Sequence, residues 1–215
     1  LVNSGCNLAI ASTMILHTPK VQEMIEHMGI PVYTDRSSYE NHPLGRTEWI
    51  KVYAEMVDKR DEAKAFFDEQ AKVILDLKDF KNTEKTVAYF YMNSDGSVVV
   101  RKSDDYIPLM IEIAGGRYIF TDLKNADSNA PSVKLTMEEF YATAVDADYL
   151  IYNSTVGGEL KTIDQLLGKS ELLEDFKAVK SGNVYCTGKN MYQETSEAGT
   201  MVYDLYQMFS GKEDG

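Results

Sequence analysis

The spacing of apolar positions near the start of the chain predicts a strand, a helix and a second strand. Apolar side chains recur at helical spacing between Pro19 and Gly29. A proline suits the first turn of a helix, and a glycine suits its left-handed end. The apolar segments 7–15 and 30–33 lie on either side and have the composition of short strands. This order is the unit of a parallel sheet.

Two amphipathic helices are predicted next, over residues 49–57 and 61–79. The second has one apolar stripe and a charged outer face, and its periodic part of about 17 residues would be roughly 25 Å long. A polar loop, 34–45, comes before them, directly after the predicted strand 30–33. Ligands of open α/β sheets lie beyond the carboxyl ends of strands, so this loop is either a ligand contact or a solvated connection.

A β-hairpin is predicted where the sequence becomes β-branched and aromatic. Residues 86–92 and 97–101 have strand composition, and the Asn-Ser-Asp-Gly turn at 93–96 joins them. Residues 107–114 predict a short apolar helix that ends at a glycine pair. Residues 121–133 predict a polar loop without periodicity.

Capping motifs mark the starts of helices in the last third of the chain. Capping boxes are predicted at 136–139 and 162–165, and Ser196 is predicted to cap the last helix. Residues 148–152 and 183–187 predict strands. Helices therefore alternate with strands in two unequal pieces, which predicts an α/β fold with a mainly parallel sheet flanked by helices.

Composition and charge narrow the possible functions. The chain has 215 residues, enough for one large domain or two small ones, and its formal net charge is −12. Nucleic acids and anionic membrane surfaces both require basic patches, so neither is an expected partner. The sequence has no apolar run long enough for a transmembrane helix, and its acidic balance fits an exported protein.

Familiar catalytic and metal-binding motifs are missing from the sequence. The three histidines all lie in the first fifth, and no two are spaced at i,i+4. There is no GxSxG motif, P-loop or GxGxxG motif. Cys6 and Cys186 form no CxxC pair; Cys186 is predicted to be buried in a strand, and an approach of the two thiols stays open. We expect no catalytic residue, no metal site and no intrinsic cofactor.

Several segments resemble one protein family. Residues 40–51, Glu-Asn-His-Pro-Leu-Gly-Arg-Thr-Glu-Trp-Ile-Lys, resemble the class III solute-binding proteins of ABC importers, which bind iron–siderophores, haem and cobalamin. Residues 18–32, 106–117, 136–151 and 176–185 resemble further stretches of that family, in the family's order. The resemblance covers nearly the whole chain.

The resemblance implies two α/β lobes with the ligand between them and one long helix joining them. Residues 1–60 would be a remnant of the first lobe, 61–82 the connecting helix, and 83–215 the second lobe with its C-terminal helix. The family's first lobe is longer than this, so we expect the chain to lack most of it. The implied fold is therefore a class III periplasmic-binding-protein-like fold with a truncated first lobe.

The resemblance also implies contacts with a permease and a ligand. An exposed acidic residue on each lobe docks on the permease in this family, and Glu138 matches that position; it would equally compensate a helix dipole. Arginines would pair with carboxylates or catecholates, and tyrosines would stack. Arg46 has the alternative of pairing with Glu40 or Glu48. The expected ligand contacts are Arg36, Tyr39 and Arg46 from the first lobe, and Tyr91, Arg101, Asn153 and Tyr192 from the second.

The implied function is that of an extracytoplasmic, monomeric substrate-binding component of an ABC importer. Its ligand would be a ferric siderophore, haem or a corrinoid, and the membrane would be reached only through a lipid anchor outside this chain. Two alternatives stay open. One is a bilobal, tetrapyrrole chelatase-like enzyme, which would need a cluster of histidines or carboxylates at its cleft, and the other is a non-catalytic interaction domain.

Overall fold

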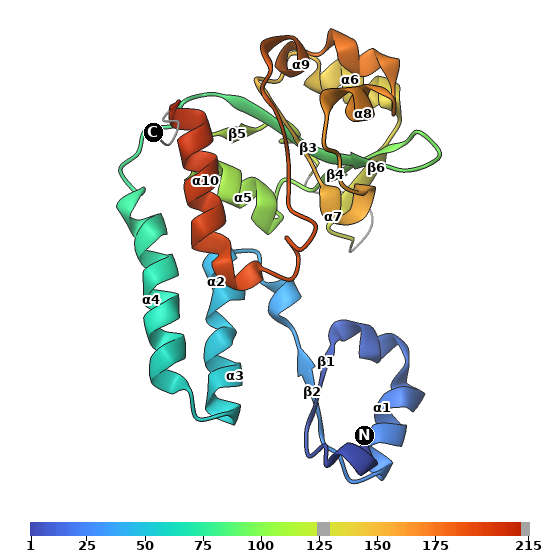
Figure 1. The fold of residues 1–215 in the computed structure, drawn as a ribbon, viewed down its shortest axis with the longest axis vertical. Helices are drawn as coiled ribbons and strands as arrows, with labels where there is room; N and C mark the ends of the chain where they lie inside the picture. Colours follow the sequence, from blue (N-terminus) through green and yellow to red (C-terminus); the bar gives the residue numbers. More distant parts are fainter. Residues whose placement is uncertain (124–129, 212–215) are drawn as a thin grey trace. The chain divides into compact units, whose positions relative to one another are not determined.

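The computed structural model describes residues 1–123 and 130–211 (Figure 1). The chain forms two compact units, unit 1 over residues 1–40 and unit 2 over residues 41–215. Each is described by itself. The predicted division into a lobe remnant, a connecting helix and a second lobe stays a prediction.

Unit 1 is a strand–helix–strand unit, as the apolar pattern predicts. Strand β1 (Ala9–Ser12) pairs in parallel with β2 (Val32–Asp35), and α1 (Pro19–His27) connects them. Gly29 follows the helix with φ +77°, a left-handed conformation that glycine adopts without steric cost. Short 3₁₀ turns in this unit are Val2–Ser4, Thr13–His17 and Ser37–Tyr39.

The sheet of unit 2 has the strand order β6-β4-β3-β7-β8, and β5 pairs with β3. Its strands are β3 (Thr86–Met92), β4 (Val98–Arg101), β5 (Arg117–Tyr118), β6 (Ser132–Leu135), β7 (Tyr149–Tyr152) and β8 (Val184–Cys186). The pairs β3–β5, β3–β7 and β7–β8 are parallel, whereas β4 is antiparallel to both β3 and β6. The predicted α/β fold with a mainly parallel sheet is therefore confirmed, and so is the hairpin of β3 and β4.

Helices lie on both faces of this sheet (Figure 1). The α-helices that the structure describes in unit 2 are α2 (Pro43–Glu48), α3 (Ile50–Met56), α4 (Arg60–Asp76), α5 (Tyr106–Ile113), α6 (Met137–Ala144), α7 (Ser154–Gly157), α8 (Ile163–Leu167), α9 (Lys177–Ser181) and α10 (Ala198–Ser210). Helices α5 and α10 lie on one side of the sheet, and α6, α8 and α9 lie on the other. Helix α10 packs against α4 and α5. At Gly199, an added Cβ would lie 2.4 Å from the carbonyl oxygen of Gln70, so only glycine permits this close approach of α10 to α4.

Aromatic rings join the sheet to the helices on one face. The ring of Phe140 in α6 lies 4.7 Å from that of Phe90 in β3 and 5.5 Å from that of Phe176. All three side chains are fully buried. Aromatic pairs of this kind contribute roughly 0.5–1.5 kcal/mol beyond their buried area. They fix α6 on the central strands.

Asp148 ties three segments of unit 2 together at the start of β7. Its carboxylate accepts hydrogen bonds from the backbone N–H of Thr86 at 2.8 Å and from Lys177 Nζ at 2.7 Å. Partial burial would raise the pKa of this carboxyl, but the hydrogen bonds from Lys177 and Thr86 outweigh it and hold the pKa below its usual value. The carboxylate thereby stabilises the pairing of β3 with β7.

Both predicted capping boxes begin helices, but only the first is complete. At α6 the Thr136 hydroxyl accepts from the N–H of Glu139, and the Glu139 carboxylate accepts from the N–H of Thr136. At α8 the N–H of Gln165 donates to the hydroxyl of Thr162, whereas the Gln165 side chain accepts from the N–H of Lys161. The second box is therefore half formed.

Other local predictions differ from the structure. Ser196 does not cap the last helix, because α10 begins at Ala198 and its N-cap position is Glu197. Cys186 is exposed rather than buried, because β8 pairs with β7 and, among the described strands, forms an edge of the sheet. Cys6 is half-buried, and both thiols are free.

Two further predictions concern segment ends. Helix α4 ends at Asp76, three residues before the predicted end. The predicted polar loop 121–133 falls in part on residues 124–129, which lie outside the described residues. Among the helices that the structure describes, none combines the length and the apolar character that crossing a bilayer requires.

Candidate functional site

Side chains from three segments of unit 2 meet at the Tyr192 hydroxyl. Arg101 is the last residue of β4, Asn153 directly follows β7, and Tyr192 lies in the segment after β8. The Tyr192 oxygen accepts a hydrogen bond from Arg101 Nη2 at 3.0 Å and another from Asn153 Nδ2 at 2.7 Å. Three of the predicted ligand contacts therefore form one hydrogen-bonded group, which we call the Arg101 cluster.

Asn153 is held in place by its position at a helix start. It is the N-cap of α7, and its side-chain oxygen accepts from the N–H of Thr155 at 3.2 Å. The residue is 1% exposed, so the amide group can only use partners inside the protein. With its oxygen engaged at the helix, its NH₂ group is directed to Tyr192.

The Arg101 guanidinium is largely buried, with 12% of its side chain exposed. Its Nε lies 3.5 Å from a carboxylate oxygen of Asp105, and its Nη1 donates to the Ser132 hydroxyl at 3.3 Å. Burial by itself would lower the pKa of Arg101, but the negative charge of Asp105 outweighs that effect and raises the pKa above its usual value. Arg101 therefore stays protonated, with Asp105 as its buried counter-charge.

Tyr106 adds an aromatic face with a second arginine. It is the first residue of α5, and the Arg46 guanidinium of α2 lies 3.7 Å from its ring centroid. The Arg101 guanidinium lies 5.9 Å from the same ring. Burial raises the pKa of Tyr106 to about 12, so the phenol is neutral at physiological pH. Arg46 thus makes a cation–π contact that the sequence analysis did not foresee.

Asp105 and Tyr89 belong to the site but were missed from the sequence. Asp105 caps α5, and its carboxylate accepts from the N–H of Ile107 at 3.2 Å. An aspartate directly before an apolar helix is a recognisable N-cap, so this residue had a signal. Tyr89 lies inside an apolar strand, with its hydroxyl 3.3 Å from the sulfur of Met191. Nothing in the sequence distinguishes it from a core tyrosine.

The remaining predicted ligand contacts lie outside this hydrogen-bonded group. Tyr91 is half-buried in β3, opposite Val99, and packs against the core. Arg36 and Tyr39 are exposed residues of unit 1, and Tyr39 is 63% exposed. Their contribution to ligand binding stays a prediction.

Glu138 lies where the sequence analysis expected it. It is exposed in the first turn of α6, while the neighbouring Glu139 closes the capping box. The structure thus leaves the Glu138 carboxylate accessible. Its predicted contact with a permease stays a prediction.

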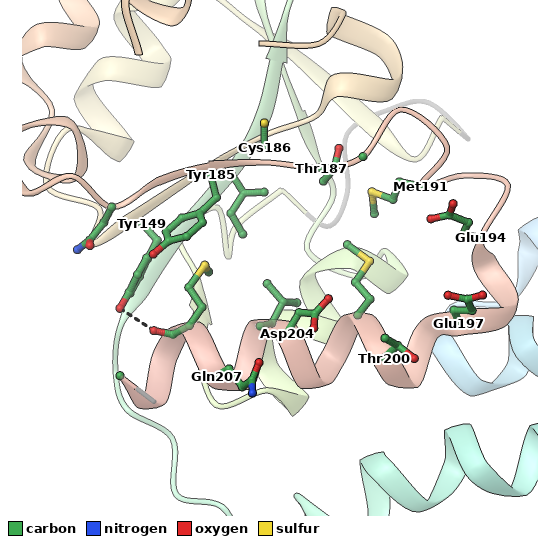
Figure 2. Close-up of a pocket in the computed structure, with 17 residues that line it drawn as sticks. Tyr149, Tyr185, Cys186, Thr187, Met191, Glu194, Glu197, Thr200, Asp204 and Gln207 are labelled. Atoms are coloured by element: carbon green, nitrogen blue, oxygen red, sulfur yellow. Dashed lines mark hydrogen bonds between the residues drawn. The ribbon is translucent and has the colours of Figure 1, made fainter. Parts of the chain in front are cut away.

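No group of three or more His, Cys, Asp or Glu side chains in the described part of the chain is arranged to hold a metal ion. A cavity of about 780 Å³ does lie in unit 2, between β7, β8 and α10 (Figure 2). Arg101, Asn153 and Tyr192 do not line it. This cavity and the Arg101 cluster are therefore separate features.

The sequence matches a family described as periplasmic binding protein over residues 8–191. It is 33% identical over 177 residues to an uncharacterized lipoprotein of Methanocaldococcus jannaschii, covering 81% of this chain and 41% of that protein. A second uncharacterized lipoprotein of the same organism is 26% identical over 207 residues, covering 90% of this chain and 51% of that protein. The chain thus spans about half the length of these curated relatives.

Solved structures with the same fold include periplasmic binding proteins. A possible iron-binding, periplasmic solute-binding protein from Staphylococcus epidermidis has a TM-score of 0.71 at 16% identity, covering 96% of this chain and 77% of that one. The periplasmic heme-binding protein BhuT, in complex with two hemes, has a TM-score of 0.70 at 16% identity, with coverages of 95% and 75%. A protein of an ABC-type Fe³⁺-hydroxamate transport system from Saccharomonospora viridis has a TM-score of 0.66 at 15% identity, with coverages of 87% and 64%.

Proposed function

Because this chain belongs to the periplasmic binding protein family, we propose that it is the substrate-binding component of an ABC importer. Members of this family bind small ligands and dock on a permease, and they are not enzymes. The chelatase-like alternative therefore loses its basis. The Arg101 cluster of unit 2 favours a ligand-binding protein over the interaction-domain alternative, because its side chains suit contacts with a small molecule.

The observation that carries the proposal is the buried, charged Arg101 at the centre of a tyrosine-rich group. A buried cation is costly unless its charge is paired, and Asp105 pairs it here. An arginine held in this way can donate to the oxygen atoms of an anionic ligand, and the nearby phenols and aromatic faces suit a flat or oxygen-rich molecule.

This chemistry favours a ferric siderophore, haem or a corrinoid as the ligand. Siderophores present carboxylates or catecholates, and haem presents two propionates, which are partners for guanidinium groups. Fold neighbours whose titles name heme, iron and Fe³⁺-hydroxamate support the same group of ligands. We propose Arg101 and Tyr192 as the central contacts, with Asn153 holding the Tyr192 hydroxyl in place, and Arg36, Tyr39, Arg46 and Tyr91 as further contacts.

The proposed setting is outside the cytoplasm. The relatives named as lipoproteins support attachment by a lipid anchor. Glu138, exposed on α6, is the proposed contact of unit 2 with the permease. We propose that the protein acts as a monomer without an intrinsic cofactor.

A binding screen tests this function. The protein is titrated with ferric siderophores, haem and cobalamin while the fluorescence of Trp49 and the thermal midpoint are followed. We expect one ligand class to saturate the protein and to raise the midpoint, because a ligand that binds only the folded state stabilises it.

Variants make the screen specific. Arg101→Gln is expected to weaken binding of that ligand by about tenfold or more, since a charge-assisted hydrogen bond is lost. Glu138→Gln, which changes an exposed carboxylate away from the cluster, is the matched control and is expected to bind normally. Saturable binding that Arg101→Gln leaves unchanged would place the ligand elsewhere.

A further inference from the structure

The cavity of about 780 Å³ in unit 2 has a lining that differs from the Arg101 cluster (Figure 2). One wall is the face of β7 and β8 with Tyr149, Ile151 and Tyr185, and the opposite wall is α10. Its volume falls within the range of about 300–1,000 Å³ that is usual for small-molecule sites. The cavity is therefore large enough for an organic ligand.

The charge of the lining has a single sign. Glu194, Glu197 and Asp204 contribute carboxylates, and no Lys, Arg or His is among the lining residues. Among the described residues, no cationic side chain forms an ion pair with Glu194 or Glu197. Lys189, close by in the sequence, pairs with Glu159 instead. Among the described residues, the negative charges of Glu194 and Glu197 are thus not neutralised by a basic side chain of the cavity wall.

The apolar part of the lining is rich in methionine. Met191, Met201 and Met208 line the cavity, and Met191 is 7% exposed. Methionine side chains are flexible and polarizable, and they fit apolar groups of different shapes. The Tyr149 hydroxyl is engaged with the carbonyl oxygen of Met208 at 3.1 Å, so its ring, rather than its hydroxyl, is available to a ligand.

The acidic and aromatic groups lie at different ends of the cavity. Figure 2 shows Glu194 and Glu197 close to the start of α10, and Tyr149 and Tyr185 at the other end, with Asp204 between them. From this arrangement we propose a second binding site, which takes an amphipathic organic cation. Its ammonium group lies at Glu194 and Glu197, and its apolar body lies over the methionines toward the tyrosines.

This site is independent of the proposed importer ligand. The Arg101 cluster offers positive charge and hydrogen-bond donors to an anionic ligand, whereas the cavity offers carboxylates and apolar surface. The two sites use opposite charges, so one ligand class does not satisfy both. A failure at one site leaves the other proposal untouched.

The test compares three probes with the same apolar chain and different charge. Hexyltrimethylammonium, hexan-1-ol and hexanoate are titrated into the protein, whose methionine methyl groups carry ¹³C for NMR. We expect hexyltrimethylammonium to shift the Met191, Met201 and Met208 signals saturably and to bind about tenfold more tightly than hexan-1-ol, with hexanoate weakest. Equal binding of the alcohol and the cation, or shifts confined to other methionines, would overturn the proposal.

A charge-matched pair of variants isolates the carboxylates. The double variant Glu194→Gln/Glu197→Gln is expected to weaken binding of the cation by about fivefold, because exposed ion pairs are individually weak. Binding of hexan-1-ol is expected to stay unchanged. The control Glu171→Gln/Glu174→Gln removes the same charge from exposed residues outside the cavity and is expected to bind the cation normally. An equal loss in both double variants would show that net charge, rather than this site, attracts the cation.

Discussion

Unit 2 encloses a continuous apolar core, whereas unit 1, all of which the structure describes, buries only Ile15 and Ile30 among its apolar side chains. The large apolar side chains that unit 1 leaves exposed are Leu1, Val2, Ile10, Met14, Leu16, Val21, Met24, Met28 and Tyr39. Both units contain parallel strands and connecting helices. The difference is that the sheet of unit 2 has helices on both faces and the two-stranded sheet of unit 1 has a single α-helix.

This contrast shows that correctly predicted strands and helices do not by themselves form a buried apolar core. The helix α1 and both strands of unit 1 form where the apolar periodicity predicts them. A parallel sheet is nevertheless stable only when both of its faces are covered, and two strands with one helix cannot do this. Unit 1 therefore has the predicted strands and helix without a substantial apolar core of its own.

The largest expected effect comes from separating the two units. A fragment of residues 41–215 is expected to unfold cooperatively, because it retains the whole core. A peptide of residues 1–40 is expected to show no cooperative transition. Circular dichroism during thermal unfolding measures both, and a cooperative transition of the peptide would remove the contrast.

A pair of single substitutions tests the same contrast at the level of side chains. Phe140→Ala in unit 2 is expected to cost about 3–5 kcal/mol of unfolding free energy, because it opens a cavity in a fully buried aromatic cluster. Met24→Ala in unit 1, at a side chain that is 58% exposed, is expected to change stability by less than about 0.5 kcal/mol. Denaturant titration of the whole chain gives both values.

Tyrosines of the two units provide a comparison in ligand binding. Tyr192→Ala is expected to weaken binding of the importer ligand by about 1–3 kcal/mol, as the loss of an aromatic anchor does. Tyr39→Ala is expected to have a smaller effect, because this side chain is 63% exposed and lacks the supporting hydrogen bonds of Tyr192. Calorimetric titration distinguishes them, and a larger loss for Tyr39→Ala would move the main contact to unit 1.

The Asp148 carboxylate predicts a pH dependence in unit 2. Since its pKa is lower in the folded than in the unfolded state, it stabilises the fold above the unfolded value and loses this contribution as the pH falls through the folded value. Asp148→Asn is expected to lower stability at pH 7 by about 1–2 kcal/mol. The variant should also lose less stability than the parent chain below about pH 4, where the unfolded carboxyl takes up its proton. Denaturant curves at pH 3 and pH 7 measure this difference.

The smallest effect on the molecule itself is expected at Glu138. Glu138→Ala should change stability by less than about 0.5 kcal/mol and leave ligand binding intact, because the side chain is exposed. If Glu138 docks on the permease, uptake of the ligand by cells should fall. Unchanged uptake would leave the residue with only its favourable position at the start of a helix.

Much of unit 2 could be predicted from local patterns. The hairpin of β3 and β4, the capping box at Thr136 and the buried strand β7 lie where the sequence places them. Prediction from the sequence was weaker where the exposure of a side chain depends on which strands or helices lie beside it. Cys186 has the sequence context of a core residue, yet it is exposed, because β8 is an edge strand in the sheet that the structure describes.

In the candidate site, too, some residues could be predicted from the sequence and others could not. Arg101, Asn153 and Tyr192 could be chosen from the sequence as residues at strand ends and in loops, and the structure joins them by hydrogen bonds. Their buried partners were not foreseen. Asp105 had a local signal as a helix cap, but its role as the counter-charge of Arg101 depends on the course of the turn between β4 and α5.

The sequence by itself determined the alternation of strands and helices, the α/β class and the family, because periodicity, capping residues and motif order are local properties of the chain. The tertiary structure decided which tyrosines surround Arg101, that Arg46 stacks on Tyr106, and that β7, β8 and α10 leave an acidic cavity between them. These features join residues far apart in the chain, and their contacts exist only once the helices have packed on the sheet.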